Sequence, residues 1–193
     1  MAAPSGKMMR KMKMDNPFDA LDAGNGAYFS WGSQAKSWKI DGSECQLTGF
    51  MIEPASIKTG YGKLGKNETP DWVWAEVPGT KMTPPSEDHK VAVYLDVYVT
   101  EADGAPSEGW KPWATNARAS REAIKSIWAE IHSGAVKNKG KVAVVKVTGS
   151  KSVEFGPAVI NVPVLELTGF ADRPGDAAVA PAPSPSSDDD DLF

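Results

Sequence analysis

The chain of 193 residues carries 25 acidic and 21 basic side chains, for a formal net charge of −4. Its single cysteine, Cys45, excludes an internal disulfide and a cysteine-rich zinc site, and its two histidines lie far apart in sequence. No apolar run approaches the ~20 residues that a membrane-spanning helix needs, so we expect no membrane contact.

The charge is unevenly distributed along the chain. Residues 171–193 contain six acidic residues and one basic residue, which leaves 19 acidic and 20 basic residues before them. The acidic balance therefore says little about whether the body binds an anion. We expect three parts: a basic disordered arm (1–14), one folded domain (15–170) and a disordered linker with an acidic tail (171–193).

Residues 1–14 carry four basic residues and no acidic one. They lack the apolar stretch of a secretory signal, and two interpretations stay open: the arm contacts phosphate, or it is an inert extension ahead of Met14. The apolar residues of the segment 15–44 do not recur with the period of a helix or a strand. We therefore expect loops with at most one short strand there. At least half of their aromatic residues should be core. The aromatic residues considered are Tyr28, Phe29, Trp31 and Trp38.

The first clear strand, residues 45–53, is followed by the glycine-rich stretch 58–66, which spells Gly-x-Gly-x-x-Gly and most of a P-loop. Both motifs need a helix that begins at the glycines. Pro70 disfavours that helix, and Asn67 stands where a P-loop needs Ser or Thr, so we reject both motifs. We predict a flexible loop that binds a single nucleic-acid strand, with a solvated hairpin loop as the alternative. Its cations and aromatic residue are Lys58, Lys63, Lys66 and Tyr61.

Residues 71–76 are predicted to form the next strand. Trp72 and Trp74 then point to the same face, where they form either a base-stacking platform or a wall of the core. In residues 90–100, predicted to be a strand, apolar and polar side chains alternate more clearly. One face, predicted to be core, carries Val91, Val93, Leu95, Val97 and Val99. The other face carries Lys90, Tyr94, Asp96 and Tyr98. The two tyrosines are candidates for base stacking, with cross-strand packing as the alternative.

A helix is predicted at residues 117–132, with Asn116 or Ser120 as its cap and Gly134 as its end. Trp128 belongs to the apolar stripe of this helix and is expected in the core. Residues 101–115 before it are predicted as a loop. Strands at 141–149 and 160–169 follow. Lys146 lies on the outward face of the first, and Pro163 indicates an edge or a bulge in the second.

Five strands with one helix between the third and the fourth is the order of an oligonucleotide-binding (OB) barrel. We therefore predict a mainly β fold: a single OB-fold-like five-stranded barrel with one helix. No metal-ligand spacing, nucleophile elbow or intact phosphate loop is present. The sequence thus predicts no enzyme, no cofactor and no metal.

The C-terminal segment combines features of a tether and of a docking tip. Residues 171–187 contain four prolines among Ala, Ser and Gly, a composition that predicts an extended chain without a core. Four aspartates and a Leu-Phe pair follow. The aspartates alone fit a solubilising tail, but the apolar pair favours docking to a partner pocket. The predicted partner-binding residues are Asp188, Asp189, Asp190, Asp191, Leu192 and Phe193.

This tail resembles that of single-stranded DNA-binding proteins of bacteria and tailed phages, which end in an Asp-rich run closed by an apolar residue and Phe. The body is similar to a phage family of such proteins through Leu47-Thr-Gly-Phe50, Lys58-Thr-Gly-Tyr-Gly62 and Pro70-Asp-Trp-Val-Trp74. The resemblance implies a protein of the host bacterial cytoplasm. It would coat single-stranded DNA and recruit replication, recombination and repair enzymes through its tail.

Two alternatives remain at this stage: an adaptor of the replication machinery that binds no DNA, and a nucleotide-binding enzyme built on the glycine-rich stretch. Self-association stays open. The candidate DNA-binding residues are Lys58, Tyr61, Lys63, Lys66, Trp72, Trp74, Lys90, Tyr94, Tyr98 and Lys146.

Overall fold

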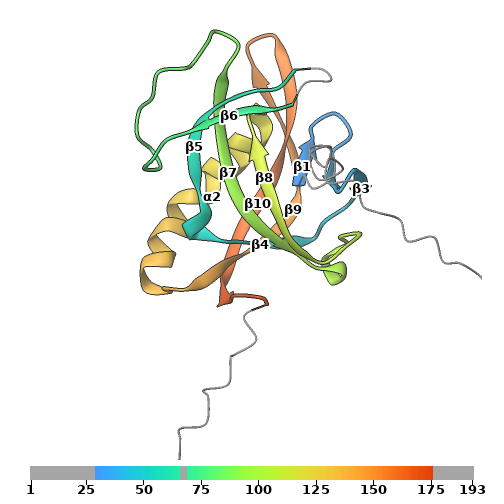
Figure 1. Cartoon of the computed structure of the whole chain (residues 1–193). Helices are drawn as coiled ribbons and strands as arrows, with labels where there is room; N and C mark the ends of the chain where they lie inside the picture. Colours follow the sequence, from blue (N-terminus) through green and yellow to red (C-terminus); the bar gives the residue numbers. More distant parts are fainter. Residues whose placement is uncertain (1–28, 66–68, 176–193) are drawn as a thin grey trace, which may run out of the picture.

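The computed structural model describes residues 29–65 and 69–175, which form two antiparallel sheets and, among these residues, one α-helix (Figure 1). The smaller sheet is a meander of β1 (Phe29–Gly32), β2 (Ser37–Ile40) and β3 (Ser43–Cys45). The larger sheet contains β4 (Gly49–Ile52), β5 (Lys58–Lys63), β6 (Asp71–Trp74), β7 (Lys90–Val99), β8 (Gly109–Thr115), β9 (Lys141–Phe155) and β10 (Ala158–Asp172). A mainly β fold with a single helix is therefore confirmed. The predicted arm (1–14) and the tip (188–193) lie outside the described residues.

The larger sheet is not closed into a barrel. Its strands follow the order β10-β9-β4-β7-β5-β6, and β8 pairs with the other edge of β7, so β8 and β10 remain edge strands. Residues 29–44, predicted as loops with at most one short strand, instead contribute to the three strands of the meander. Strand β1 packs beside β8 and is hydrogen-bonded to β10. There the indole N–H of Trp31 donates a hydrogen bond to the carbonyl oxygen of Asn161 at 2.9 Å. The meander thus stands between the two edges that a closed five-stranded barrel would join.

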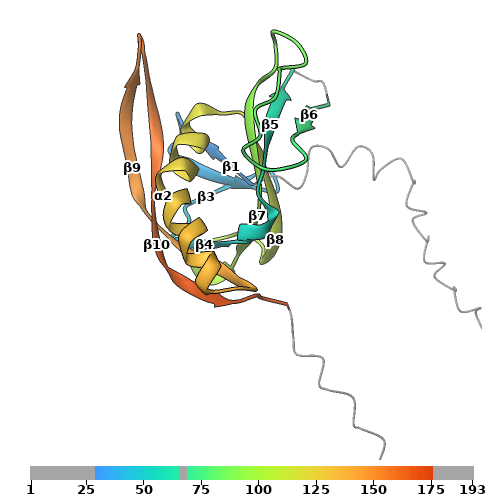
Figure 2. The ribbon, with the colours of Figure 1, turned by 90° about the vertical axis from the view of Figure 1, so that its left-hand side faces the viewer.

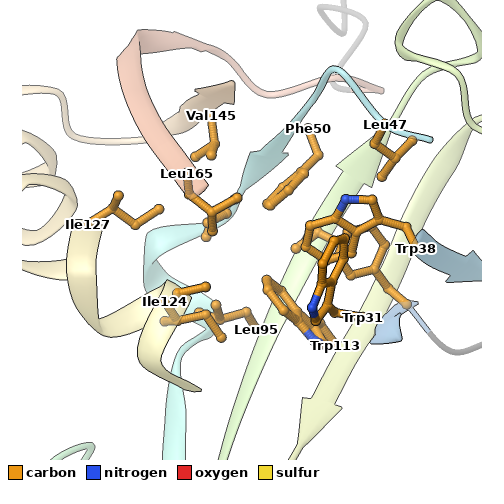
Figure 3. Packing of buried hydrophobic residues seen from close by; sticks show 14 of the residues in the cluster. Trp31, Trp38, Leu47, Phe50, Leu95, Trp113, Ile124, Ile127, Val145 and Leu165 are labelled. Carbon is orange, nitrogen blue, oxygen red and sulfur yellow. The ribbon is translucent and has the colours of Figure 1, made fainter. Parts of the chain in front are cut away.

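Aromatic rings fill the core between the two sheets (Figure 3). Phe29 lies 4.8 Å from Trp38 and 5.0 Å from Trp113 between ring centroids, and Trp38 lies 5.5 Å from Phe50. The Phe29–Trp113 and Trp38–Phe50 pairs are edge-to-face, and the Phe29–Trp38 pair is tilted at 32°. Edge-to-face pairs add about 0.5–1.5 kcal/mol each beyond the burial of apolar area. The expectation that at least half of the aromatic residues of 15–44 are core holds for Phe29, Trp31 and Trp38, while Phe18 and Tyr28 lie outside the described residues.

Helix α2 (Arg118–Lys137) is longer than predicted and continues through Gly134. Gly134 is required there because a Cβ atom would lie 2.3 Å from the ring of Phe170 in β10. The helix ends one turn later, where the backbone N–H and the side-chain amide of Asn138 both donate to the carbonyl oxygen of Gly134. Neither proposed capping side chain is used, because Ala117 is the N-cap residue.

Strands β9 and β10 form a long hairpin of fifteen residues per strand. The hairpin lies on the side of α2 away from β5 and β6 (Figure 2). Pro163 lies in the edge strand β10 beside a register irregularity at Val164/Leu165, as predicted. Within residues 29–65 and 69–175, no helix has the length and apolar character needed to cross a membrane.

Candidate nucleic-acid interface

The outward face of β5, β6, β7 and β8 carries five aromatic side chains. On β7, Leu95, Val97 and Val99 are fully buried, so the even-numbered residues point away from the core. We call this surface the aromatic face. Its rings are Trp72, Trp74, Tyr94, Tyr98 and Trp110. All five are partly exposed and none belongs to the buried core cluster, whereas Trp38 and Trp113 are completely buried.

Trp72 and Trp74 lie parallel to each other, with ring centroids 5.4 Å apart and an angle of 13° between the planes. Their shared direction confirms the prediction from strand alternation. Both glycines of the Gly-x-Gly sequence in β5 face this pair. A Cβ atom at Gly62 would lie 2.1 Å from the indole of Trp72, and one at Gly60 would lie 2.0 Å from the carbonyl oxygen of Val73.

Residues 58–63 are therefore a strand and not the flexible loop predicted from sequence. The glycines are present because an indole and a neighbouring backbone occupy the space of their side chains, and no phosphate loop is formed. Residues 64–70 connect β5 to β6, and Lys66 in this connection lies outside the described residues.

The stack continues onto β7 through Tyr94. The ring of Trp74 meets the ring of Tyr94 edge-to-face at 6.0 Å, and the Nζ atom of Lys58 lies 5.0 Å from the centroid of Tyr94. The tyrosine hydroxyl donates to the carboxylate of Asp96 at 2.6 Å. Burial, followed by this hydrogen bond and the charge of Asp96, raises the pKa of Tyr94 to about 12. The hydrogen bond to Asp96 thus fixes the direction of the hydroxyl group.

A second pair of rings lies further along β7. Tyr98 and Trp110 pair across β7 and β8, with centroids 5.4 Å apart and planes at 66°. The Tyr98 hydroxyl donates to Glu108 at 2.6 Å, and that hydrogen bond is the main cause that raises the pKa of Tyr98.

Trp110 was missed because Pro112 argues against a strand, yet β8 is an edge strand in which proline is tolerated. The signal was present in the sequence, because two tryptophans three residues apart point to opposite faces of a strand. Trp113 is completely buried, and Trp110 is outside.

The predicted cations divide into two groups. Lys58 and Lys90 are exposed on the aromatic face, and the Nζ atom of Lys90 donates to the carbonyl oxygen of Glu87. Lys63 points to the opposite face of β5 and forms an ion pair with Asp88 at 3.4 Å. Lys146 lies in β9 opposite Gly49, with β4 between it and β7.

Tyr61 is not part of the aromatic face. It alternates with Gly60 and Gly62 and so points to the other side of β5, where its hydroxyl donates to the carbonyl oxygen of Met82 at 3.2 Å. Val91 also differs from its prediction: it is 50% exposed, because the end of β7 extends past the core.

Among residues 29–65 and 69–175, no group of three or more His, Cys, Asp or Glu residues could hold a metal ion. Burial raises the pKa of the Cys45 thiol, which lowers its reactivity. The aromatic face brings together six of the ten candidate DNA-binding residues: Lys58, Trp72, Trp74, Lys90, Tyr94 and Tyr98. No family model, no curated protein and no solved structure matches this chain.

Proposed function

We propose that the protein binds single-stranded DNA, without sequence preference, along the aromatic face. The observation that carries the proposal is the continuous contact of Trp72, Trp74 and Tyr94 outside the core, with Lys58 at its end. Aromatic rings on an outer strand face offer stacking surfaces to any base, worth about 1–3 kcal/mol per base, and lysines neutralise phosphates.

The order of the strands supports the same proposal. Taken as β8-β7-β4-β9-β10, with α2 between β8 and β9, the larger sheet follows the strand order of an OB fold, which is itself often only partly open. In that fold the second and third strands and the loop before them bind oligonucleotides. The corresponding strands here are β7 and β8, which carry Tyr94, Tyr98 and Trp110.

The spacing of the rings fits a short stretch of DNA. Tyr94 and Tyr98 are four residues apart on β7, which corresponds to about 13 Å along the strand. At about 3.4 Å per stacked nucleotide, this distance spans about four nucleotides, the lower end of the range for one OB domain.

We also propose that the Asp188–Phe193 segment recruits replication, recombination or repair enzymes, as the resemblance to phage single-stranded DNA-binding proteins implies. The acidic and apolar composition of the segment supports this role, because it fits an apolar pocket with a basic rim.

An adaptor function without DNA binding is the second candidate. It is favoured by Asp96 and Glu108, whose carboxylates lie beside the rings and would repel phosphate. Exposed Tyr and Trp also anchor many protein interfaces.

Titration with oligo-dT, followed by tryptophan fluorescence, separates the two functions. We expect saturable quenching of the tryptophan fluorescence. The affinity should fall steeply as the salt concentration rises, because lysines that neutralise phosphates displace counterions from the DNA. Binding to a duplex of the same length should be weaker. Equal or tighter duplex binding would falsify the proposal, and no change in fluorescence or anisotropy with labelled oligo-dT would leave the adaptor function.

A further inference from the structure

A surface pocket of about 380 Å³ lies between the C-terminal half of α2, the residues that follow it and the short turn η2 (Pro54–Ser56). This volume falls in the range of small ligand sites. Trp128 lines the pocket, so we call it the Trp128 pocket. It is built from residues outside the aromatic face.

The floor of the pocket is apolar. Trp128 was expected in the core, but it is only partly buried: it packs against the core and is also open to the pocket. Val136, one of the most exposed large apolar residues of the described chain at 64%, lines the same pocket together with Ala135, Pro54 and Ala55. Covering this floor with another apolar group would be favourable by about 25 cal/mol for each Å² removed from water.

The rim of the pocket is basic. Lys139 forms no ion pair within the described residues, and Lys141 forms only a weak surface pair, at 3.6 Å, with an Asp172 carboxylate that is 94% exposed. Glu53 is the acidic residue of the lining, and Arg173 neutralises it at 2.9 Å. An apolar floor with a net positive rim matches the composition of Asp188–Phe193: four carboxylates followed by Leu and Phe.

The chain leaves the described structure beside this pocket. Arg173, two residues before the last described residue, bonds to Glu53 of the pocket lining. Residues 176–187 separate this point from Asp188. Twelve residues have an r.m.s. end-to-end distance of about 20 Å as a random coil, and they span about 37 Å in polyproline II conformation. Such a tether gives an effective concentration on the order of mM, so even a weak pocket would be occupied by its own tail.

We propose that the Trp128 pocket binds the Asp188–Phe193 segment of the same chain. Leu192 and Phe193 cover Trp128 and Val136, and the aspartates lie against Lys139 and Lys141. The consequence rests on the proposed recruiting role of the tail: while the tip is docked, it is unavailable to a partner enzyme, so recruitment requires a partner that competes with the pocket.

We test this proposal by measuring ¹⁵N relaxation of the Leu192 and Phe193 amides in the full-length chain, in the absence of DNA. The relaxation reports how far these two residues are restrained. In the natural chain we expect restrained amides. Val136→Asp places a negative charge on the floor of the pocket, which repels the aspartates of the tail. This variant should lower the order parameters of the Leu192 and Phe193 amides to the flexible range below about 0.6. Val159→Asp is the matched control, because Val159 is 63% exposed and lies near the tip of the β9–β10 hairpin. It should change nothing, and thermal melting checks that both variants fold.

Tip amides that are equally mobile in all three proteins overturn the proposal, as does an equal response to the two substitutions. Restraint that disappears on tenfold dilution also overturns it, because the occupant would then belong to a second copy. Since no DNA is present, failure here is distinct from failure of oligo-dT binding.

Discussion

The guanidinium group of Arg173 lies over the ring of Trp110, with 4.8 Å from its Cζ atom to the ring centroid. The same side chain bonds to Glu53, and the indole N–H of Trp110 donates to the carbonyl oxygen of Pro174 at 3.3 Å. These contacts tie the residues that follow β10 to one end of the aromatic face. The base of the acidic tail is therefore next to the proposed DNA path.

Removing this contact should uncover Trp110. For Arg173→Ala we expect a loss of about 0.5–1 kcal/mol in the free energy of unfolding, typical of a partly exposed cation–π pair. Acrylamide should then quench Trp110 more strongly, measured as the difference from the Trp110→Phe variant. Arg173→Lys should restore the charge but not the protection, because an ammonium group lacks the flat guanidinium face. Unchanged quenching in Arg173→Ala would show that the stacking does not persist in solution.

The position of Trp72 should depend on Gly62. In Gly62→Ala the new Cβ atom would overlap the indole of Trp72, which is partly exposed and can swing away at small cost to the fold. We expect the affinity for oligo-dT to fall by the worth of one stacked base, about 1–3 kcal/mol, with little change in melting temperature.

Gly32→Ala is the control for this variant, because its Cβ atom would meet its nearest neighbour at an ordinary 3.4 Å. Equal affinities of the two alanine variants would contradict the role of the Trp72–Trp74 stack.

The raised pKa of Tyr94 predicts a loss of stability in alkali. In the unfolded chain the phenol titrates near its ordinary pKa of 10, and in the folded chain near 12. Between these values the folded state binds more protons than the unfolded state, so the free energy of unfolding must fall as pH rises. Tyr98, whose pKa is also raised, acts in the same direction. Urea unfolding from pH 9 to pH 12 measures this slope, which Tyr94→Phe should make shallower. A slope unaffected by that substitution would mean that burial and the hydrogen bond to Asp96 do not raise the pKa of Tyr94 in the folded chain.

Deleting residues 188–193 should leave the fold intact, because the described core lies entirely before residue 176. Wherever the tip lies, its four aspartates carry the same sign of charge as DNA phosphate and repel it. Single-strand binding should therefore be unchanged or tighter, most visibly at low salt, where the Debye length is longest. In pull-down experiments the shortened chain should no longer capture replication proteins. Phe193→Ala alone should weaken this capture without changing the affinity for DNA. If the full-length and the shortened chain capture the same partners, the tail serves only solubility and the docking role is wrong.

Strand alternation was the most reliable guide in this sequence. It placed Tyr94 and Tyr98 on the outward face of β7, and it placed Trp72 and Trp74 side by side. The loop prediction for residues 58–63, and with it the role of Tyr61, was wrong, because glycines that make room for a neighbouring ring look the same in sequence as glycines of a mobile loop. Only the packing of Trp72 on Gly62 distinguishes the two.

Long-range contacts explain the remaining differences. Phe29, Trp31 and Trp38 form short strands that are stabilised by packing against β8 and β10, a contact with no local signal. Gly134 would ordinarily end a helix, but the ring of Phe170 needs the space beside it, and the helix continues. Trp128 fits the apolar stripe of α2, yet the residues that the structure describes leave part of its ring open to the pocket.

The central claim is that exposed rings of the aromatic face stack on DNA bases. The most direct measurement is the affinity for fluorescently labelled oligo-dT, at physiological ionic strength, of Trp72→Ala, Trp74→Ala and the control Trp128→Ala. Trp128 is also partly exposed but belongs to α2, outside the aromatic face. We predict that Trp72→Ala and Trp74→Ala each lose about 1–3 kcal/mol of binding free energy while their melting temperatures stay close to that of the natural chain, and that Trp128→Ala binds normally. Equal affinities in all three variants, or losses that only follow a lowered melting temperature, would contradict the account.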